Sequence, residues 1–137
     1  MARTREDIER DLEARGRPFQ VLDDDTIIVP LVSGQAPAMV RVEPPVVVLQ
    51  VNIGEVSFTG DTKAAAFYRK LLELNATSLM HAAYGINDRH VVLSAALALD
   101  NLDSNELEAV LADLGLALVE HLPMLRQMAS AESTGTS

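Results

Sequence analysis

Three histidines and one run of acidic residues are the candidates for metal or acid–base chemistry in this sequence of 137 residues. His81 and His90 lie in segments that we expect to pair as a β-hairpin, about 13 Å apart at roughly 3.3 Å per residue, which is too far to share a metal ion. His121 has no acidic residue at the spacing of an H-E-x-x-H helix. The run Asp23-Asp24-Asp25 lacks the spaced oxygen ligands of a calcium loop, so we expect a solvated turn. The sequence therefore predicts no metal site.

Catalytic signatures are absent. The chain has no cysteine, which excludes thiol nucleophiles, thiolate metal sites and disulfides. It contains no G-x-S-x-G elbow, phosphate-binding loop or dinucleotide-binding motif. Neighbouring acids such as Glu106 and Glu108 are two residues apart on an expected helix and point to different sides, so they are not paired for acid–base work. We predict a non-enzyme without catalytic residues or cofactors; the alternative is an enzyme that gathers Asp61, Arg69 and Arg89 around an enclosed pocket.

Composition limits the class of protein and the class of partner. A chain of this length is one domain by ordinary size, and we expect residues 1–128 to form it and residues 129–137 to be a disordered tail. No run approaches the roughly 18 apolar residues of a membrane helix. The charged N-terminal segment lacks the apolar stretch of a secretory signal, so we expect a cytoplasmic location. The net charge of -9 and the absence of Trp disfavour nucleic acid. We therefore expect neither nucleic acid nor a membrane as the partner.

Residues 62–122 hold the clearest periodicity in the chain and predict a helix, a strand, a two-residue turn, a second strand and a helix. We place the turn at Asn87-Asp88, because both residues tolerate positive φ. Opposed residues of an antiparallel pair share a face, so the hairpin has a lighter face that carries His81 and His90 and an opposite, apolar face. The apolar face consists of Met80, Ala82, Tyr84, Val91, Leu93 and Ala95.

The first residues predict a short helix. Thr4, with Asp7 three residues later, is typical of a helix N-cap, and the helix over residues 5–15 carries a narrow apolar stripe of Ile8 and Leu12. So narrow a stripe fits two alternatives. The segment is either an ordinary surface helix or a movable flap beside a binding groove.

Several antiparallel strands follow. Residues 19–22, 26–32 and 39–43 have short β-type patterns, and Pro30 indicates a sheet edge or a bulge because proline cannot donate to a ladder. Residues 46–53 are apolar at consecutive positions, which predicts a central strand buried on both faces or nearly so. The last helix is expected to begin after Asp103 and to kink or restart at Pro123. The fold class is therefore α+β: a helix, antiparallel strands, a helix, a β-hairpin and a helix, with a single layer of helices on an antiparallel sheet.

Five segments between residues 62 and 122 resemble one known superfamily, the type III secretion chaperones of the Tir-chaperone type and the related YbjN-like proteins. The segments are Leu71-Leu72-Glu73-Leu74-Asn75, Ala83-Tyr84-Gly85-Ile86, Val91-Val92-Leu93, Leu97-Ala98-Leu99 and Leu107 through Leu118. The resemblance implies a small, acidic, cytoplasmic and usually homodimeric α+β protein without enzymatic activity. It also implies binding of an extended, partly apolar segment of a secreted partner.

Our principal hypothesis is therefore a homodimeric peptide- or protein-binding module; the alternative is a regulatory or assembly subunit that binds a folded partner. In the first case apolar pockets and a strand edge take an unfolded segment, with main-chain pairing for affinity and pockets for selectivity. The predicted peptide-binding residues are Ile8, Leu12, Phe19, Val21 and Ile28.

The helix that precedes the hairpin has an apolar arc wider than one covering sheet requires. Ala65, Tyr68 and Leu72 form a second stripe on it, which belongs either to the ordinary core or to a contact with another element or subunit. The predicted dimer contacts near the twofold axis are Phe67, Leu71 and Leu74.

Overall fold

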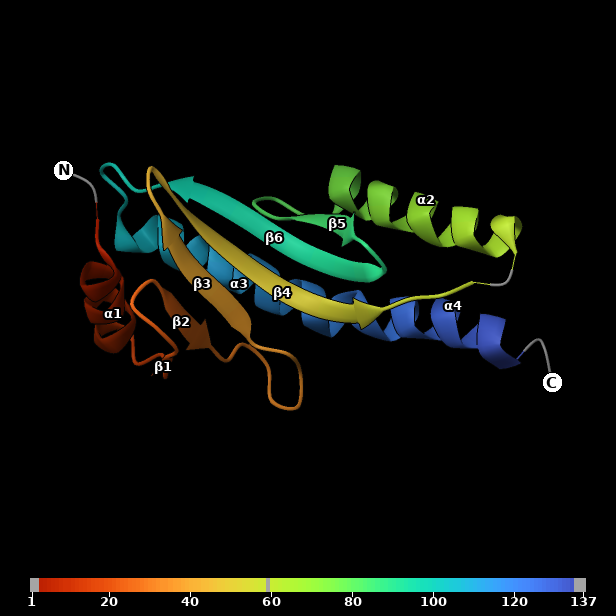
Figure 1. Ribbon diagram of the computed structural model, residues 1–137, viewed down its shortest axis with the longest axis horizontal. Coiled ribbons are helices and arrows are strands. Elements are labelled where there is room, and N and C mark those ends of the chain that lie inside the picture. Colours follow the sequence, from red (N-terminus) through yellow and green to blue (C-terminus); the bar gives the residue numbers. More distant parts are fainter. Residues whose placement is uncertain (1–2, 59, 135–137) are drawn as a thin grey trace.

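The computed structural model describes residues 3–58 and 60–134 and shows six antiparallel strands in one sheet, with α3 and α4 behind it in Figure 1. In space the strands follow the order β1-β2-β3-β4-β6-β5, and α2 lies along the β5 side. The predicted α+β class is confirmed. The elements are α1 (Arg5–Ala14), β1 (Gln20–Val21), β2 (Thr26–Val29), β3 (Ala38–Glu43), β4 (Val46–Glu55), α2 (Asp61–Thr77), β5 (Ala83–Asn87), β6 (His90–Ala98), α3 (Ser104–Glu120) and α4 (Leu122–Thr134).

Both predicted helix starts are built as capping boxes. The side chain of Thr4 accepts a hydrogen bond from the Asp7 N–H, and Asp7 accepts one from the backbone of Thr4. Asp103 and Glu106 form the same reciprocal pair at the start of α3. The last helix is interrupted close to Pro123, as predicted, and divides into α3 and α4. The backbone of α4 is helical as far as Thr134, which includes the first part of the expected tail; residues 135–137 lie outside the described residues.

The β5–β6 turn lies one residue later than predicted. Asn87 pairs with His90, so Asp88 and Arg89 are the loop residues. Asp88 has a φ of 58°, whereas a type I′ turn would need positive φ at both loop positions. Each β5 residue therefore pairs with a β6 residue two positions later than predicted. Side chains alternate between the two faces of a strand, so a shift by an even number keeps every residue on its predicted face. Tyr84, for example, still shares its face with Leu93. Met80 is the exception, because β5 begins only at Ala83 and leaves Met80 exposed outside the sheet.

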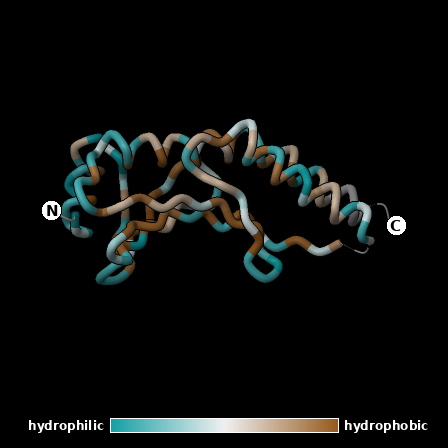
Figure 2. Tube along the Cα trace, turned by 90° about the horizontal axis from the view of Figure 1, so that it is seen from above, coloured by the Kyte–Doolittle hydropathy of each residue, from teal (hydrophilic) through white to brown (hydrophobic). Residues whose placement is uncertain are grey.

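Strand β4 is central, between β3 and β6, but it is not buried on both faces. Val47, Leu49 and Val51 are buried, whereas the alternate residues Val46 and Val48 are only half-buried. The helices cover one face of the sheet, and consecutive valines do not show which face that is. In Figure 2 the hydrophobic residues follow the strands through the middle of the molecule, while hydrophilic residues gather in the turns.

Helix α1 is anchored to the core and to α3. Ile8 and Leu12 are 0% and 1% exposed and belong to the core cluster of the sheet. The Arg17 side chain forms two hydrogen bonds to one carboxylate of α3, with Nε 2.8 Å from Oε2 and Nη2 2.7 Å from Oε1 of Glu108. These bonds hold the pKa of Glu108 below its usual value. In this geometry α1 is docked on the core, which favours the surface helix over the flap.

Candidate functional site

The face of the sheet that points away from the core has no helix over it in the described part of the chain (Figure 1). Its side chains lie in rows across the strands, because opposed residues of antiparallel neighbours point the same way. One row crosses five strands and is half-buried over most of its length. It consists of Ile28, Met39, Gln50, Ser94 and Ala83. We call this surface the open face.

A shallow basin of about 560 Å³ lies on the open face near the β1–β2 and β5–β6 turns. Apolar side chains form part of its lining, and amide, hydroxyl, carboxylate, guanidinium and imidazole groups form the rest. Such a mixture can take apolar side chains and can also hydrogen-bond to a peptide backbone. The lining residues are Leu22, Asp23, Thr26, Met39, Arg41, Gln50, Asn52, Asn87, Asp88, His90 and Val92.

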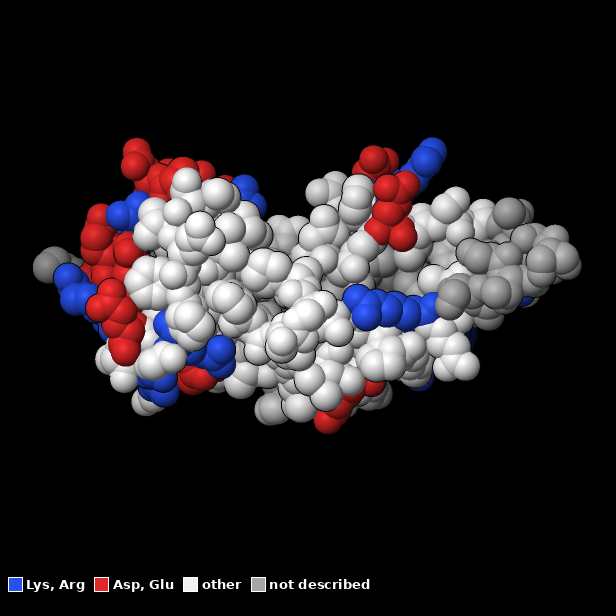
Figure 3. Space-filling model, turned by 90° about the horizontal axis from the view of Figure 1, so that it is seen from below, with Lys and Arg blue, Asp and Glu red and all other residues white. Residues whose placement is uncertain are grey.

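The charges at the basin are concentrated beside the β1–β2 turn. The backbone N–H of Asp25 donates to Asp23 Oδ1 at 2.9 Å. This hydrogen bond is the largest cause that lowers the pKa of the Asp23 carboxyl, and the charge of Arg41 lowers it further. Arg41 Nε also lies 3.7 Å from Glu43 Oε2. The acidic turn is exposed, as predicted. Figure 3, which views the molecule from below, shows acidic side chains gathered at its N-terminal end.

The predicted peptide-binding residues do not form one surface. Ile8 and Leu12 are core residues under α1, so a ligand cannot reach them while α1 is docked. Phe19 and Val21 lie on the core side of the sheet at its β1 edge, since Val21 opposes the buried Ile27. Only Ile28, opposite Met39, is on the open face.

Three apolar residues of the basin were not predicted as binding residues, and one of them is Val92 of β6. Leu22, 55% exposed, comes directly before the acidic turn, and Met39 lines the basin from β3. The alternation along residues 39–43 puts Val40 and Val42 on one face and Met39 on the other, and the structure shows that the face of Val40 is the core.

In α2, the stripe predicted to form the dimer is buried inside its own chain. Phe67, Leu71 and Leu74 all lie in the core cluster. Tyr68 and Leu72, on the adjoining stripe, are exposed, and Leu72 is 67% exposed. Tyr68 packs edge-on against Phe58, with ring centroids 6.1 Å apart. The sequence pattern contained both stripes, and only the tertiary structure shows which one faces solvent.

The outer edge of β5 is closed by side chains. Asn75 of α2 donates from Nδ2 to the Tyr84 carbonyl at 3.1 Å and accepts from the Tyr84 N–H at 2.7 Å. Asp113 of α3 accepts the N–H groups of His81 at 2.9 Å and Ala82 at 3.0 Å. An amide side chain thus takes the place of a neighbouring strand at Tyr84, which protects this edge from pairing with another chain.

Comparison with known proteins identifies the family. The model of the family CesT_Tir_1, a family of type III secretion chaperones, matches residues 1–131. The chain belongs to the CesT_Tir_1 family. No curated protein matches the sequence.

Two solved structures share the fold of this CesT_Tir_1 chain. One is a chain of the heterodimeric ExoU-SpcU complex from the type III secretion system of Pseudomonas aeruginosa, with a TM-score of 0.60 and 18% identity over 84% of this chain and 96% of that chain. The other is YbjN, a putative transcription regulator from E. coli, with a TM-score of 0.56 and 12% identity over 96% of this chain and 92% of that chain. The predicted resemblance is therefore confirmed.

A buried polar pair joins β5 to the break between α3 and α4 of this CesT_Tir_1 protein. Tyr84 Oη lies 2.9 Å from Nδ1 of His121, and both residues are buried. Burial raises the pKa of the Tyr84 hydroxyl and lowers the pKa of the His121 imidazole. A neutral tyrosine and a neutral imidazole satisfy each other, which fits a structural contact.

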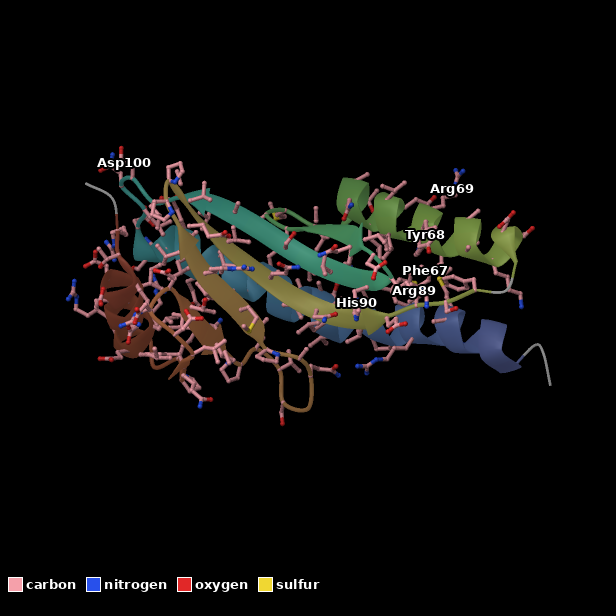
Figure 4. All side chains as sticks on the ribbon, viewed as in Figure 1. Phe67, Tyr68, Arg69, Arg89, His90 and Asp100 are labelled. Atoms are coloured by element: carbon pink, nitrogen blue, oxygen red, sulfur yellow. The ribbon has the colours of Figure 1, made fainter. Side chains whose placement is uncertain are left out.

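The alternative catalytic set is not assembled. In Figure 4 Arg69 points outward from α2, away from Arg89 in the β5–β6 turn, and Arg69 Nε lies 3.5 Å from Glu73 Oε2. The described residues contain no group of three His, Cys, Asp or Glu side chains that could hold a metal ion. None of the described helices has the length and apolar character needed to cross a membrane.

Proposed function

We propose that this CesT_Tir_1 protein is a non-enzymatic, cytoplasmic, homodimeric module that binds an extended segment of a partner protein. The observation that carries the proposal is the open face, a sheet surface with an apolar and hydrogen-bonding basin and no described helix over it. Family membership supports the same role.

The β1 edge supplies the main-chain part of the binding site. Leu22 donates its N–H to Thr26 O at 2.9 Å, so the backbone groups of Val21 point the other way, out from the sheet. A segment that pairs with this edge would run past Leu22 and place side chains on the basin. Backbone pairing then provides affinity, and the basin selects side chains.

Leu22→Asp is expected to weaken partner binding about tenfold or more, because it puts a charge on the apolar rim of the basin. The partner is captured from native cell lysate on the tagged chain, identified by mass spectrometry and titrated against both variants. Leu116→Asp on α3 is the matched control, with an exposure of 54% against 55% for Leu22. Equal binding by the Leu22 variant would remove the basin from the site. A partner that loses affinity when denatured would instead indicate a folded-surface contact.

The outward stripe of α2 is the proposed dimer surface. Leu72→Asp is expected to convert the dimer to monomers at micromolar concentration, because it places a charge in an apolar contact. Light scattering reads the mass against the 14.8 kDa of one chain. Val119→Asp, at 58% exposure on α3, controls for a general effect of a surface charge. A wild-type chain that is already monomeric would contradict the dimer.

A further inference from the structure

Strand β6 is paired along its whole length on one side and along about half of it on the other. On the β4 side the ladder continues to Ala98, opposite Val46. On the β5 side the last pair is Ala83 with Ser94, so no strand of the described residues lies beside residues 95–98. Figure 1 shows the same asymmetry, since β5 accompanies only the first part of β6. We call the bare side of residues 95–98 the β6 notch.

In the notch, alternate residues of β6 point their backbone N–H and carbonyl groups away from β4. Tyr84 and Leu93 oppose each other, and the Tyr84 N–H and carbonyl bond outward to Asn75 and not to β6. The N–H and carbonyl of Leu93 therefore point to β4. Bonding direction alternates along a strand. The Leu99 N–H accordingly points to β4 and donates to Pro45 O at 3.0 Å. Ala96 and Ala98 therefore direct their N–H and carbonyl groups into the notch, and both residues are exposed.

The notch persists because another contact diverts the chain before β5. Asp113 holds the N–H groups of His81 and Ala82, which would otherwise extend β5 along β6. Both bonds, at 2.9 and 3.0 Å, end on one carboxylate oxygen, and an ionised acceptor makes hydrogen bonds stronger than a neutral one does. The segment that precedes β5 is thus held away from the notch.

A cavity of about 280 Å³ lies beside the notch, on the core side of the sheet, between β6 and the first turns of α3. Leu97 and Ala109 provide its apolar part, and the carboxylates of Asp103 and Glu106 stand at its rim. Asn105 and His81 complete the lining. Both acids are exposed, and their capping bonds leave carboxylate oxygens available to a cation.

We propose that the β6 notch binds an extended segment of another protein that carries an apolar residue and, two positions away, a Lys or Arg. Backbone pairing with Ala96 and Ala98 holds the segment. The apolar side chain fills the cavity at Leu97, and the basic side chain meets the acidic rim. The spacing of two follows because alternate residues of a strand share a face. The site lies toward the opposite edge of the sheet from β1 and does not depend on the proposed basin.

A labelled peptide, Ser-Thr-Leu-Thr-Lys-Thr-Ser, tests the proposal by fluorescence anisotropy. Ala109→Leu, which fills the cavity, is expected to weaken binding about tenfold, and Ala112→Leu on the exposed side of α3 to leave it unchanged. Asp103→Asn with Glu106→Gln keeps capping side chains and removes the charge. This pair is expected to weaken the Lys peptide severalfold at low salt, but not a peptide with Gln in place of Lys.

N-methylated peptides distinguish binding by main-chain strand pairing from binding through side chains alone. Antiparallel addition needs the N–H groups of the Thr residues, and parallel addition needs those of Leu and Lys, so methylation of one set abolishes binding and methylation of the other is tolerated.

The proposal would be overturned if Ala109→Leu bound the peptide as tightly as wild type does. It would also be overturned if both methylated peptides bound as tightly as the unmethylated one. A wild-type self-association that Ala109→Leu removes would overturn it as well, because the occupant would then be a second copy. Leu22→Asp is expected to bind this peptide as well as wild type does. The proposal for the basin and the proposal for the notch are therefore tested independently.

Discussion

Replacing Leu12 with alanine is expected to lower the free energy of unfolding by about 2–5 kcal/mol, the usual cost of a cavity at a buried leucine. Leu12 is 1% exposed and lies in the core cluster with Ile8. Such a loss is a large share of the roughly 5–15 kcal/mol that stabilises a typical domain. Urea unfolding followed by circular dichroism measures it, and Leu116→Ala at an exposed position is expected to stay within about 0.5 kcal/mol of wild type.

The same variant tests the docking of α1. If α1 were a movable flap, Leu12→Ala would change partner binding and leave the unfolding midpoint nearly unaltered. Hydrogen exchange adds a second readout. Amides of a docked α1 should exchange at rates close to those of the core, and fast exchange in α1 alone would support the flap.

Replacing Asn75 with leucine is expected to lower the free energy of unfolding by about 2–4 kcal/mol. Both the N–H and the carbonyl of Tyr84 lose their partner, at about 1–3 kcal/mol for each buried polar group left unsatisfied. The amide of Tyr84 should also exchange faster with solvent. Chemical denaturation gives the energy, and hydrogen exchange resolved by NMR gives the site.

Asn52→Leu is the matched control, because Asn52 is exposed on the open face. A loss of stability equal to that of Asn75→Leu would show that the effect comes from replacing an amide by an apolar side chain and not from the β5 edge. The Asn75 variant should in addition aggregate more readily, since it frees a strand edge for pairing. An Asn75 variant as stable as wild type would contradict the role of this side chain.

The candidate site was only partly predictable. Ile28 lies on the open face, but the strand at Pro30 is not the edge of the sheet, because β2 pairs with both β1 and β3. Leu22 and Met39 were missed because each belongs to a short apolar run, in which one residue faces the core and its neighbour faces solvent. Choosing between them requires knowing which face the helices cover.

Local chemistry in the sequence determined the helix starts at Thr4 and Asp103, the interruption near Pro123 and the sides of the hairpin. These features depend on residues at most a few positions apart, or on a period of two that survives a shift of the turn. The class of fold follows from their order. In each case the physical cause lies within one element or between neighbouring strands.

Only the tertiary structure decided which apolar residues are core and which are surface. Leu71 and Leu72 are adjacent, yet the first is buried and the second exposed, because β5 and α4 pack against one side of α2. Asn75 of α2 covers the β5 edge at Tyr84, and Asp113 of α3 holds the segment before β5 away from the β6 notch. Contacts of this kind join residues far apart in the chain, and no local pattern records them.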